Sequence, residues 1–261
     1  MLGNGLLSRD RDYGDSLLIS RSVPLSLMAR IARLVVPGLP HHVTQRGNRR
    51  GQVFFSDADY GFYAKLLGEA AVSAGAEVWA YCLMPNHVHI ILTPSGEDGL
   101  RGTFADLHRR YTGEINARHR WTGHLWQGRF GSVPMDEEHL IAAVRYVSLN
   151  PVRAGMARRP EDWRWSSVRA HLAGHDDGVV KVAPVLERVG NFREFITTPF
   201  DEEAAFLPLR RAETIGRPIG SEEWIRQLEQ QFDRPLAPRP RGPKPRAHLA
   251  EQAGLFSKLS P

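Results

Sequence analysis

The chain has 261 residues, 42% of them hydrophobic, which supplies enough apolar side chains for a folded core of ordinary size. Lysine and arginine outnumber aspartate and glutamate by 34 to 29, so a polyanionic partner is compatible with the charge but not required by it. A single cysteine, Cys82, excludes an intramolecular disulfide framework and a cysteine-based zinc cluster, and no apolar run is long enough to span a bilayer. We therefore expect a globular protein, located in the cytoplasm and not associated with a membrane.

The first 27 residues have balanced charge, scattered glycine and serine, and no sustained hydrophobic period. We expect them to be a disordered leader, and Met28, where a stronger pattern begins, is a candidate for the true start. The rest of the chain divides into a predicted main domain over 28–172, a helical extension over 173–233 and a basic, proline-rich tail over 234–261.

Strand and helix patterns alternate along the main domain. Strands are predicted at 40–46, at 78–84, around His87 and His89, and at 129–133. Helices are predicted from 57 or 59 to about 73, from 100 or 103 to about 119, and from a cap at Asp136 until Pro151. The order β-α-β-β-α-β followed by a helix predicts an α+β fold of the ferredoxin-like (split βαβ) type. In this sandwich a four-stranded antiparallel sheet carries helices on one face, and the other face is free for a site.

A pair of histidines stands out in the stretch Met84-Pro-Asn-His-Val-His-Ile-Ile-Leu-Thr93. Because side chains alternate along a strand, Val88 and Ile90 face one way, and His87 and His89 both project from the opposite face. Two imidazoles on a rigid strand predict a metal site that lacks its last protein ligand. Taken alone, however, a His-x-His pair is more often two unrelated histidines.

The helix that follows Asp136 carries a second signal, Arg145-Tyr-Val-Ser-Leu-Asn150-Pro-Val-Arg153. Tyr146 and Asn150 are four residues apart and hence neighbours on the helix surface. They could supply a hydroxyl nucleophile and a neutral oxygen ligand for one metal. By themselves, such residues are more often a packing side chain and a helix cap.

Taken together, the histidine pair, the loop Leu125-Trp-Gln-Gly-Arg-Phe130 and the helix reading Tyr146-x-x-x-Asn150-Pro-Val-Arg-Ala-Gly155 occur in that order in one small domain. In these motifs the chain resembles the REP-associated tyrosine transposases, a branch of the HUH single-strand transposases of insertion sequences. The resemblance spans about 37–170 and includes Val43-Thr-Gln-Arg-Gly-Asn-Arg-Arg50. The segment from Gly216 through Arg246 also looks like the tails of some members.

The resemblance implies a function and assigns roles to residues. It implies an enzyme that cleaves and rejoins single-stranded, hairpin-forming DNA through a 5′-phosphotyrosine, with Mg or Mn as the cofactor. Tyr146 would be the nucleophile, His87 and His89 the HUH metal ligands, and Asn150 a further metal ligand. Many relatives outside this branch have glutamine at the Asn150 position, so ligation by the shorter asparagine is the weakest of these assignments.

Basic and aromatic residues near these motifs predict a surface for a single DNA strand, because phosphates attract arginine and exposed bases stack on aromatic rings. The candidates are Arg46, Arg49, Arg50, Arg109, Arg110, Trp126, Arg129 and Arg153. The proline-rich tail carries further positive charge. The segment before it, 221–232, predicts a capped amphipathic helix that either contacts DNA or docks on the main domain.

Several alternatives stay open. Tyr111 is a rival nucleophile, although its spacing with Leu107 and Ile115 favours a packing role. His41, His42 and His139 are further histidines that could approach the metal, with structural roles as the simpler interpretation. On the same fold, the chain could instead be a non-catalytic nucleic-acid-binding protein or a phosphodiesterase that uses water. Either a homodimer or a monomer is compatible with the sequence.

Overall fold

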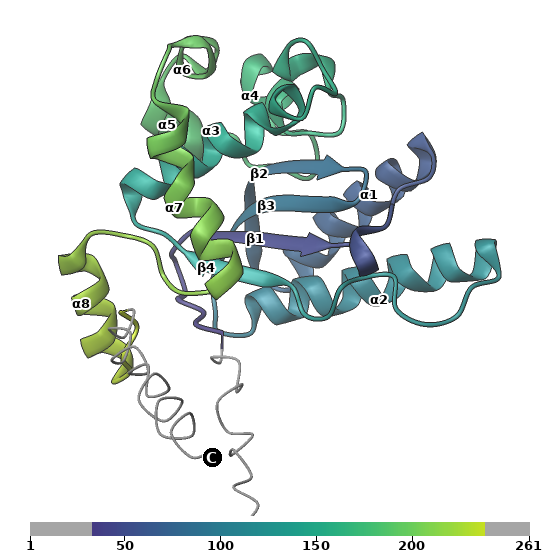
Figure 1. The fold of residues 1–261 in the computed structure, drawn as a ribbon, viewed down its shortest axis with the longest axis horizontal. Coiled ribbons are helices and arrows are strands. Elements are labelled where there is room, and N and C mark those ends of the chain that lie inside the picture. The colour runs from purple at the N-terminus through teal and green to yellow at the C-terminus, as the bar shows by residue number, and fades with distance from the viewer. Residues whose placement is uncertain (1–32, 238–261) are drawn as a thin grey trace, which may run out of the picture. The chain divides into compact units, whose positions relative to one another are not determined.

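A four-stranded antiparallel sheet organises the part of the chain that the structure, a computed structural model, describes: residues 33–237 (Figure 1). The strands are β1 (His41–Arg46), β2 (Ala76–Met84), β3 (His87–Pro94) and β4 (Gly131–Pro134), in the order β2-β3-β1-β4. This confirms the predicted α+β fold with its split βαβ topology. The predicted leader, the candidate start at Met28 and the tail beyond residue 237 lie outside the described residues.

One face of the sheet packs on two long helices, α1 (Asp57–Ser73) and α2 (Gly99–His119). Val43, Val88 and Ile90 point to this side and are fully buried against apolar side chains of both helices. The α1 helix begins where the buried Asp59 accepts hydrogen bonds from the backbone N–H groups of Phe55 and Ser56, at 2.7 and 2.9 Å. The alternation predicted for β3 therefore places its histidines on the opposite face.

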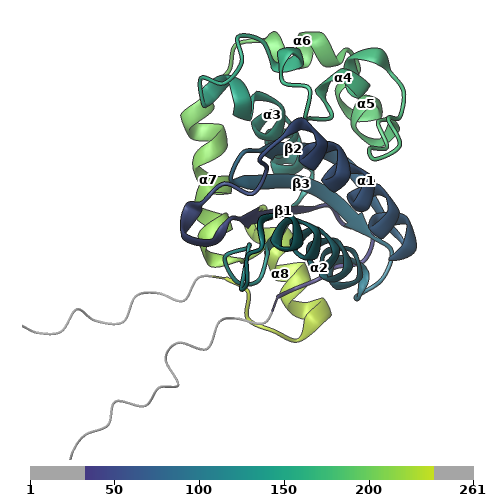
Figure 2. The same cartoon turned by 90° about the vertical axis from the view of Figure 1, so that its right-hand side faces the viewer.

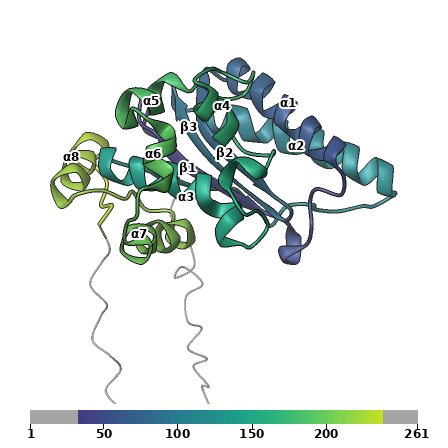
Figure 3. The same cartoon turned by 90° about the horizontal axis from the view of Figure 1, so that it is seen from above.

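The opposite face is not free, and this part of the prediction is wrong. Helices α3 (Glu137–Arg153) and α7 (Glu202–Ile215) cover it, so the sheet lies between two helical layers (Figure 3). The cause is the composition of β2: Ala80, Cys82 and Met84 make its second face as apolar as its first. A strand that is hydrophobic on both faces must be buried on both.

The third helix also ends later than predicted, at Arg153 rather than before Pro151. Proline is costly in a helix because it lacks the N–H that would bond to the carbonyl four residues earlier. Here Pro151 lies in the last turn, and the helix closes through the N–H groups of Ala154 and Gly155, which donate to Asn150 and Val152 at 2.9 Å each. The proline therefore weakens the last turn without stopping the helix at that residue.

The described chain after α3 is helical. Besides α7, this part contains α4 (Val168–Ala173), which lies at the end of the predicted main domain, and α5 (Ala183–Val189), α6 (Phe192–Thr197) and α8 (Glu222–Phe232) in the predicted extension. Helices α4, α5 and α6 lie beyond the β2 edge of the sheet (Figure 2). The predicted cap of α8 is present: the hydroxyl of Ser221 accepts a hydrogen bond from the N–H of Trp224 at 3.2 Å. Leu228 of α8 is buried against Leu34 and Val36, so this helix docks on the described chain.

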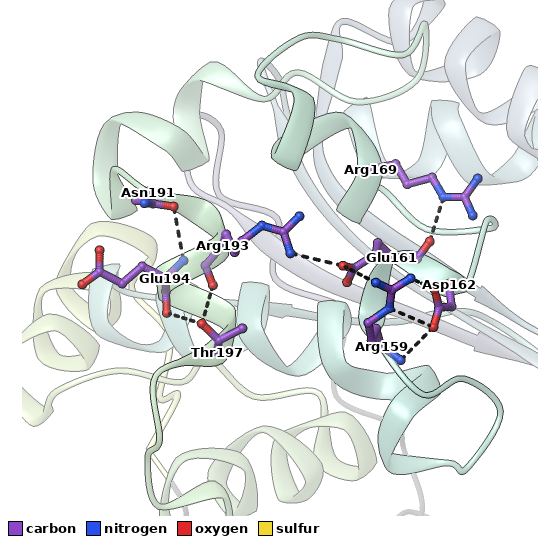
Figure 4. A network of polar contacts seen from close by, with 8 residues as sticks. All are labelled: Arg159, Glu161, Asp162, Arg169, Asn191, Arg193, Glu194 and Thr197. Carbon is purple, nitrogen blue, oxygen red and sulfur yellow. Dashed lines mark hydrogen bonds and ion pairs between the residues drawn. The ribbon is translucent and has the colours of Figure 1, made fainter.

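A surface network joins α6 to the segment that follows α3 (Figure 4). Glu161, in the short 3-10 helix η3 (Pro160–Asp162), is paired with Arg193 of α6 at 3.2 Å. Arg159 is paired with Asp162 at 2.8 Å, and Arg169 donates to the backbone oxygen of Glu161 at 2.7 Å. Exposed ion pairs like these contribute little stability each, but they fix the orientation of the parts that they join.

Among residues 33–237, no helix has both the length and the hydropathy that crossing a bilayer requires.

Arg145 ties α3 to the extension, and we predict that its loss is destabilising. Its guanidinium lies over the rings of Phe195 and Phe200, 4.3 Å from each centroid. Arg145→Ala is expected to lower the free energy of unfolding by about 1–3 kcal/mol, since two cation–π contacts and their packing are removed. The free energy of unfolding of Arg145→Lys should lie between those of the wild type and Arg145→Ala, because lysine keeps the charge but lacks the flat guanidinium. Urea unfolding measures both variants, and an Arg145→Ala protein as stable as the wild type would contradict the prediction.

We predict that His171 makes the free energy of unfolding depend on pH. It is buried in α4, its Nδ1–H donates to the carbonyl of Ser167 at 2.8 Å, and its ring stacks on Phe192. Burial lowers the pKa of His171, so on acidification the unfolded chain binds a proton before the folded chain does. This contribution to stability is complete above the unfolded pKa of about 6.5 and declines as the pH falls below it, by at most roughly 1.4 kcal/mol per pH unit.

The matched variant is His171→Phe, which keeps a ring against Phe192 and removes the titrating group. Unfolding free energies measured by urea between about pH 7 and about pH 5 should fall less steeply for the variant than for the wild type. Parallel pH profiles would show that His171 does not contribute.

Candidate functional site

Three histidines gather on the sheet face that α3 and α7 cover. His87 and His89 come from β3, and their ring centroids are 5.0 Å apart. His42 comes from β1, where it shares this face because Thr44, two residues on, lies opposite His89 in the register. The Nε2 atom of His42 is 3.1 Å from Nδ1 of His89, and their rings are stacked with centroids 5.2 Å apart. Two strands therefore present imidazoles to one point.

A carboxylate from α7 reaches the same point. The Oε1 atom of Glu213 lies 3.7 Å from Nδ1 of His89 and 3.8 Å from Nδ1 of His42. This oxygen is buried and has no hydrogen-bond partner in the part of the chain that the structure describes. His42, His89 and Glu213 offer ligand atoms that lie within 4.8 Å of one another, as a bound metal ion would require.

Burial controls the charge of these groups. It lowers the pKa of His42 to about 4, and it lowers that of His87, with the charge of Arg46 adding to the effect, to about 4 as well. Burial also holds the pKa of His89 well below its usual value. Neutral imidazole is the form that binds a metal. Burial raises the pKa of Glu213 to about 7, a shift that a bound cation would oppose. The donor set therefore fits a divalent cation.

Tyr146 of α3 lies against the histidines. Its ring centroid is 5.4 Å from that of His89 and 6.0 Å from that of His42, with both pairs edge to face. Phe206 of α7 packs on the ring, and the guanidinium of Arg153 lies 5.3 Å from its centroid. Burial raises the pKa of Tyr146, with Glu213 adding to this and Arg153 opposing it. The phenol is thus placed next to the imidazoles in a largely desolvated setting, with 7% of the residue exposed.

The other predicted site residues differ in their placement. Asn150 is 9% exposed and lies one turn after Tyr146 on the same side of α3, and its role as a ligand stays a prediction. His87 is held by Asn86, whose Oδ1 is 2.6 Å from Nδ1 of the imidazole.

Among the predicted arginines, Arg46 lies opposite His87, and Arg153 lies beside Tyr146. Arg49, Arg50 and Arg129 are exposed in the loops after β1 and before β4.

Three residues of the predicted DNA-contacting set lie away from Tyr146, and their contact with DNA stays a prediction. Trp126 is 6% exposed and packs in the core, where its ring centroid lies 4.7 Å from that of His108. Arg109 and Arg110 lie on α2, on the far side of the sheet from Tyr146, where they pair with Asp106 and Glu69 at 2.7 and 3.0 Å. The positions of Trp126, Arg109 and Arg110 along the sequence do not indicate on which side of the sheet each residue packs.

The rival residues have structural roles. The hydroxyl of Tyr111 donates to the carbonyl of Val53 at 2.8 Å, inside the layer of α1 and α2. His41 accepts a hydrogen bond from the N–H of Val36 at Nε2 and lies 2.8 Å from the carbonyl of Leu39 at Nδ1. His139 is paired with Asp136 at the start of α3. None of these three is part of the cluster around His89.

The comparison with known proteins matches the main domain. The family model described as "Transposase IS200 like" matches residues 35–150, just under half of the chain. Over this segment the chain is similar to the IS200-like transposases. This confirms the resemblance that the motifs indicated, and it places His42, His89 and Tyr146 inside this segment and Glu213 outside it.

Individual relatives are distant. A REP-associated tyrosine transposase of Escherichia coli K12 is 24% identical over 37% of this chain and 57% of its own length. A Haemophilus influenzae protein, named provisionally as a REP-associated tyrosine transposase, is 27% identical over 39% of this chain and 66% of its own length. The chain thus spans between 57% and 66% of these relatives. A solved REP-associated tyrosine transposase bound to a REP hairpin is 22% identical, with a TM-score of 0.49 over 59% of this chain and 92% of that one.

Proposed function

We propose that this protein is a metal-dependent transposase or endonuclease that cleaves and rejoins single-stranded, hairpin-forming DNA. One observation carries the proposal: in the segment that is similar to the IS200-like transposases, the ring of Tyr146 packs edge to face on His89, 5.4 Å between centroids, at a point where buried imidazoles meet. A tyrosine that served only to pack would not need this polar surrounding. Tyr146 is therefore the proposed nucleophile.

The proposed reaction exchanges one phosphoester bond for another. The phenolic oxygen of Tyr146 attacks phosphorus, the bond from phosphorus to the 3′ oxygen breaks, and that oxygen leaves as a 3′-hydroxyl after taking up a proton. A 5′-phosphotyrosine results, and attack by a 3′-hydroxyl reverses the step and releases the tyrosine. Because the bond energy is conserved in the phosphotyrosine, rejoining needs neither ATP nor water.

The residues around Tyr146 have proposed roles in this step. Arg153, whose charge counteracts the raised pKa of Tyr146, favours the phenolate that attacks. A divalent ion, Mg or Mn, would be held by His87, His89 and Asn150, and when bound it would neutralise the charge of the phosphate and orient it. The buried setting of the histidines excludes water, which limits hydrolysis of the phosphotyrosine.

A basic rim would guide the DNA. Arg46, Arg49, Arg50, Arg129 and Arg153 remain the proposed phosphate contacts of this rim, while Trp126, Arg109 and Arg110 are not part of it because of their positions. The protein would act in the cytoplasm as a monomer or a homodimer. The location and the oligomeric state are parts of the proposal and do not follow from the fold.

The test is incubation of the full chain with an end-labelled hairpin oligonucleotide and Mg or Mn, followed by a denaturing gel. We expect a labelled protein band that resists denaturant and that disappears when the metal is chelated. Binding without an adduct or cleavage would favour the non-catalytic nucleic-acid-binding protein. Cleavage without an adduct would favour a phosphodiesterase that uses water.

A further inference from the structure

The cluster around Glu213 was not expected from the sequence, and it joins two parts of the chain. His42 and His89 lie in the segment that is similar to the IS200-like transposases, and Glu213 belongs to α7 in the C-terminal extension. We infer that His42, His89 and Glu213 bind a divalent metal ion, so that the extension supplies one ligand of a metal centre beside Tyr146. This goes beyond the proposed function, because such binding needs neither DNA nor the tyrosine.

His42 can offer only one of its two ring nitrogens to an ion, and with one ligand atom from each residue the three atoms lie within 4.8 Å of one another. Metal–ligand bonds of about 2.0–2.2 Å in a tetrahedral or octahedral arrangement separate neighbouring ligand atoms by roughly 3.0–3.5 Å. Nε2 of His42 and Nδ1 of His89 are already 3.1 Å apart. Oε1 of Glu213, at 3.7 Å from Nδ1 of His89, needs to move toward that nitrogen by only a few tenths of an ångström.

Nε2 of His42 and Nδ1 of His89 are hydrogen-bonded to each other, but Glu213 takes no part in that hydrogen bond. The distances from Oε1 of Glu213 to the two Nδ1 atoms, 3.7 and 3.8 Å, are too long for hydrogen bonds. This carboxylate oxygen is buried without a partner, which is costly for a charged group and uncommon in folded proteins. A cation at the centre would satisfy the carboxylate and both imidazoles at once.

The ligand types indicate which ions fit. Two imidazole nitrogens and one carboxylate oxygen suit Zn, Co or Mn better than Mg, which prefers a shell of oxygen ligands. Three protein ligands leave coordination positions open, which is typical of catalytic rather than structural zinc sites. The site shares His89 with the centre proposed for DNA cleavage and lies beside the ring of Tyr146.

The experiment measures metal binding directly, in the full chain and without DNA. Calorimetric titration with Zn and the visible absorption of bound Co are compared among the wild type, Glu213→Gln and His42→Gln. We expect one tight ion in the wild type, and a loss of affinity of at least about 10-fold in each variant, because each removes a ligand. Glu203→Gln is the matched control: it removes a carboxylate from the exposed part of the same helix and should bind like the wild type.

Two results would overturn the inference. The first is wild-type affinity in Glu213→Gln, and the second is the absence of binding to the wild type. If circular dichroism shows that Glu213→Gln or His42→Gln is poorly folded, Glu213→Asp is measured in its place. A cobalt spectrum of Glu213→Asp identical to that of the wild type would count against the inference. If binding depends on His87 and Asn150 but not on His42 and Glu213, the inference fails, whereas the metal site of the proposed function stands. The adduct assay tests that function separately.

Discussion

Replacing Tyr146 with phenylalanine is expected to abolish the covalent protein–DNA adduct. The substitution removes one oxygen and keeps the ring that packs on His89 and Phe206, so the fold should be retained. The loss should be on the order of 10⁴-fold or more in cleavage rate, as is found when an enzyme loses its nucleophile. The measurement is the labelled-oligonucleotide gel with protein in excess, read at times from seconds to hours.

Tyr111→Phe is the matched control for this variant. It also removes a tyrosine hydroxyl, but one that donates to the carbonyl of Val53 in the other helical layer. We expect adduct formation to persist in this variant and the free energy of unfolding to fall by about 1–2 kcal/mol, because the buried carbonyl loses its donor. If Tyr111→Phe lost the adduct and Tyr146→Phe kept it, the nucleophile would have been assigned to the wrong helix.

Much of the fold could be predicted because its signals are local. The alternation through His87, Val88, His89 and Ile90 is a property of the strand itself, and it sets which face carries the imidazoles. The same holds for α8, where Ser221 caps the helix that the apolar spacing predicts. Periodicity and capping act over a few residues and can therefore be recognised without the tertiary structure.

What could not be predicted depends on contacts between distant segments. Trp126 has the neighbours of a DNA-stacking residue along the chain, yet it packs against His108, because the loop before β4 folds over α2. Glu213 has no motif around it, and only the docking of α7 brings its carboxylate to His89. His42 carried a weak signal, since it alternates with Thr44 on β1, but a partner was needed to separate it from an ordinary buried histidine.

His89 is the residue whose replacement should have the widest consequences, because it alone belongs to both ligand sets. Its Nδ1 atom faces His42 and Glu213, at 3.1 and 3.7 Å. Its ring also contacts Tyr146 and His87. We expect His89→Gln to lower the affinity for Zn or Co by more than about 100-fold, a larger loss than removal of an outer-shell partner causes, and to abolish adduct formation. Titration and the gel assay on one protein preparation give both values.

Comparing His89→Asn with His89→Gln distinguishes the two proposed metal sites that share His89. The amide of asparagine occupies the place of Nδ1 and that of glutamine the place of Nε2, so each variant keeps a polar atom on one side of the imidazole. If the site with His42 and Glu213 is the one that holds the ion, His89→Asn should retain more affinity than His89→Gln. The exposed His175 provides the control: His175→Gln should leave both readouts unchanged. Wild-type affinity and adduct yield in His89→Gln would mean that this imidazole supports packing alone, and neither metal centre would then stand.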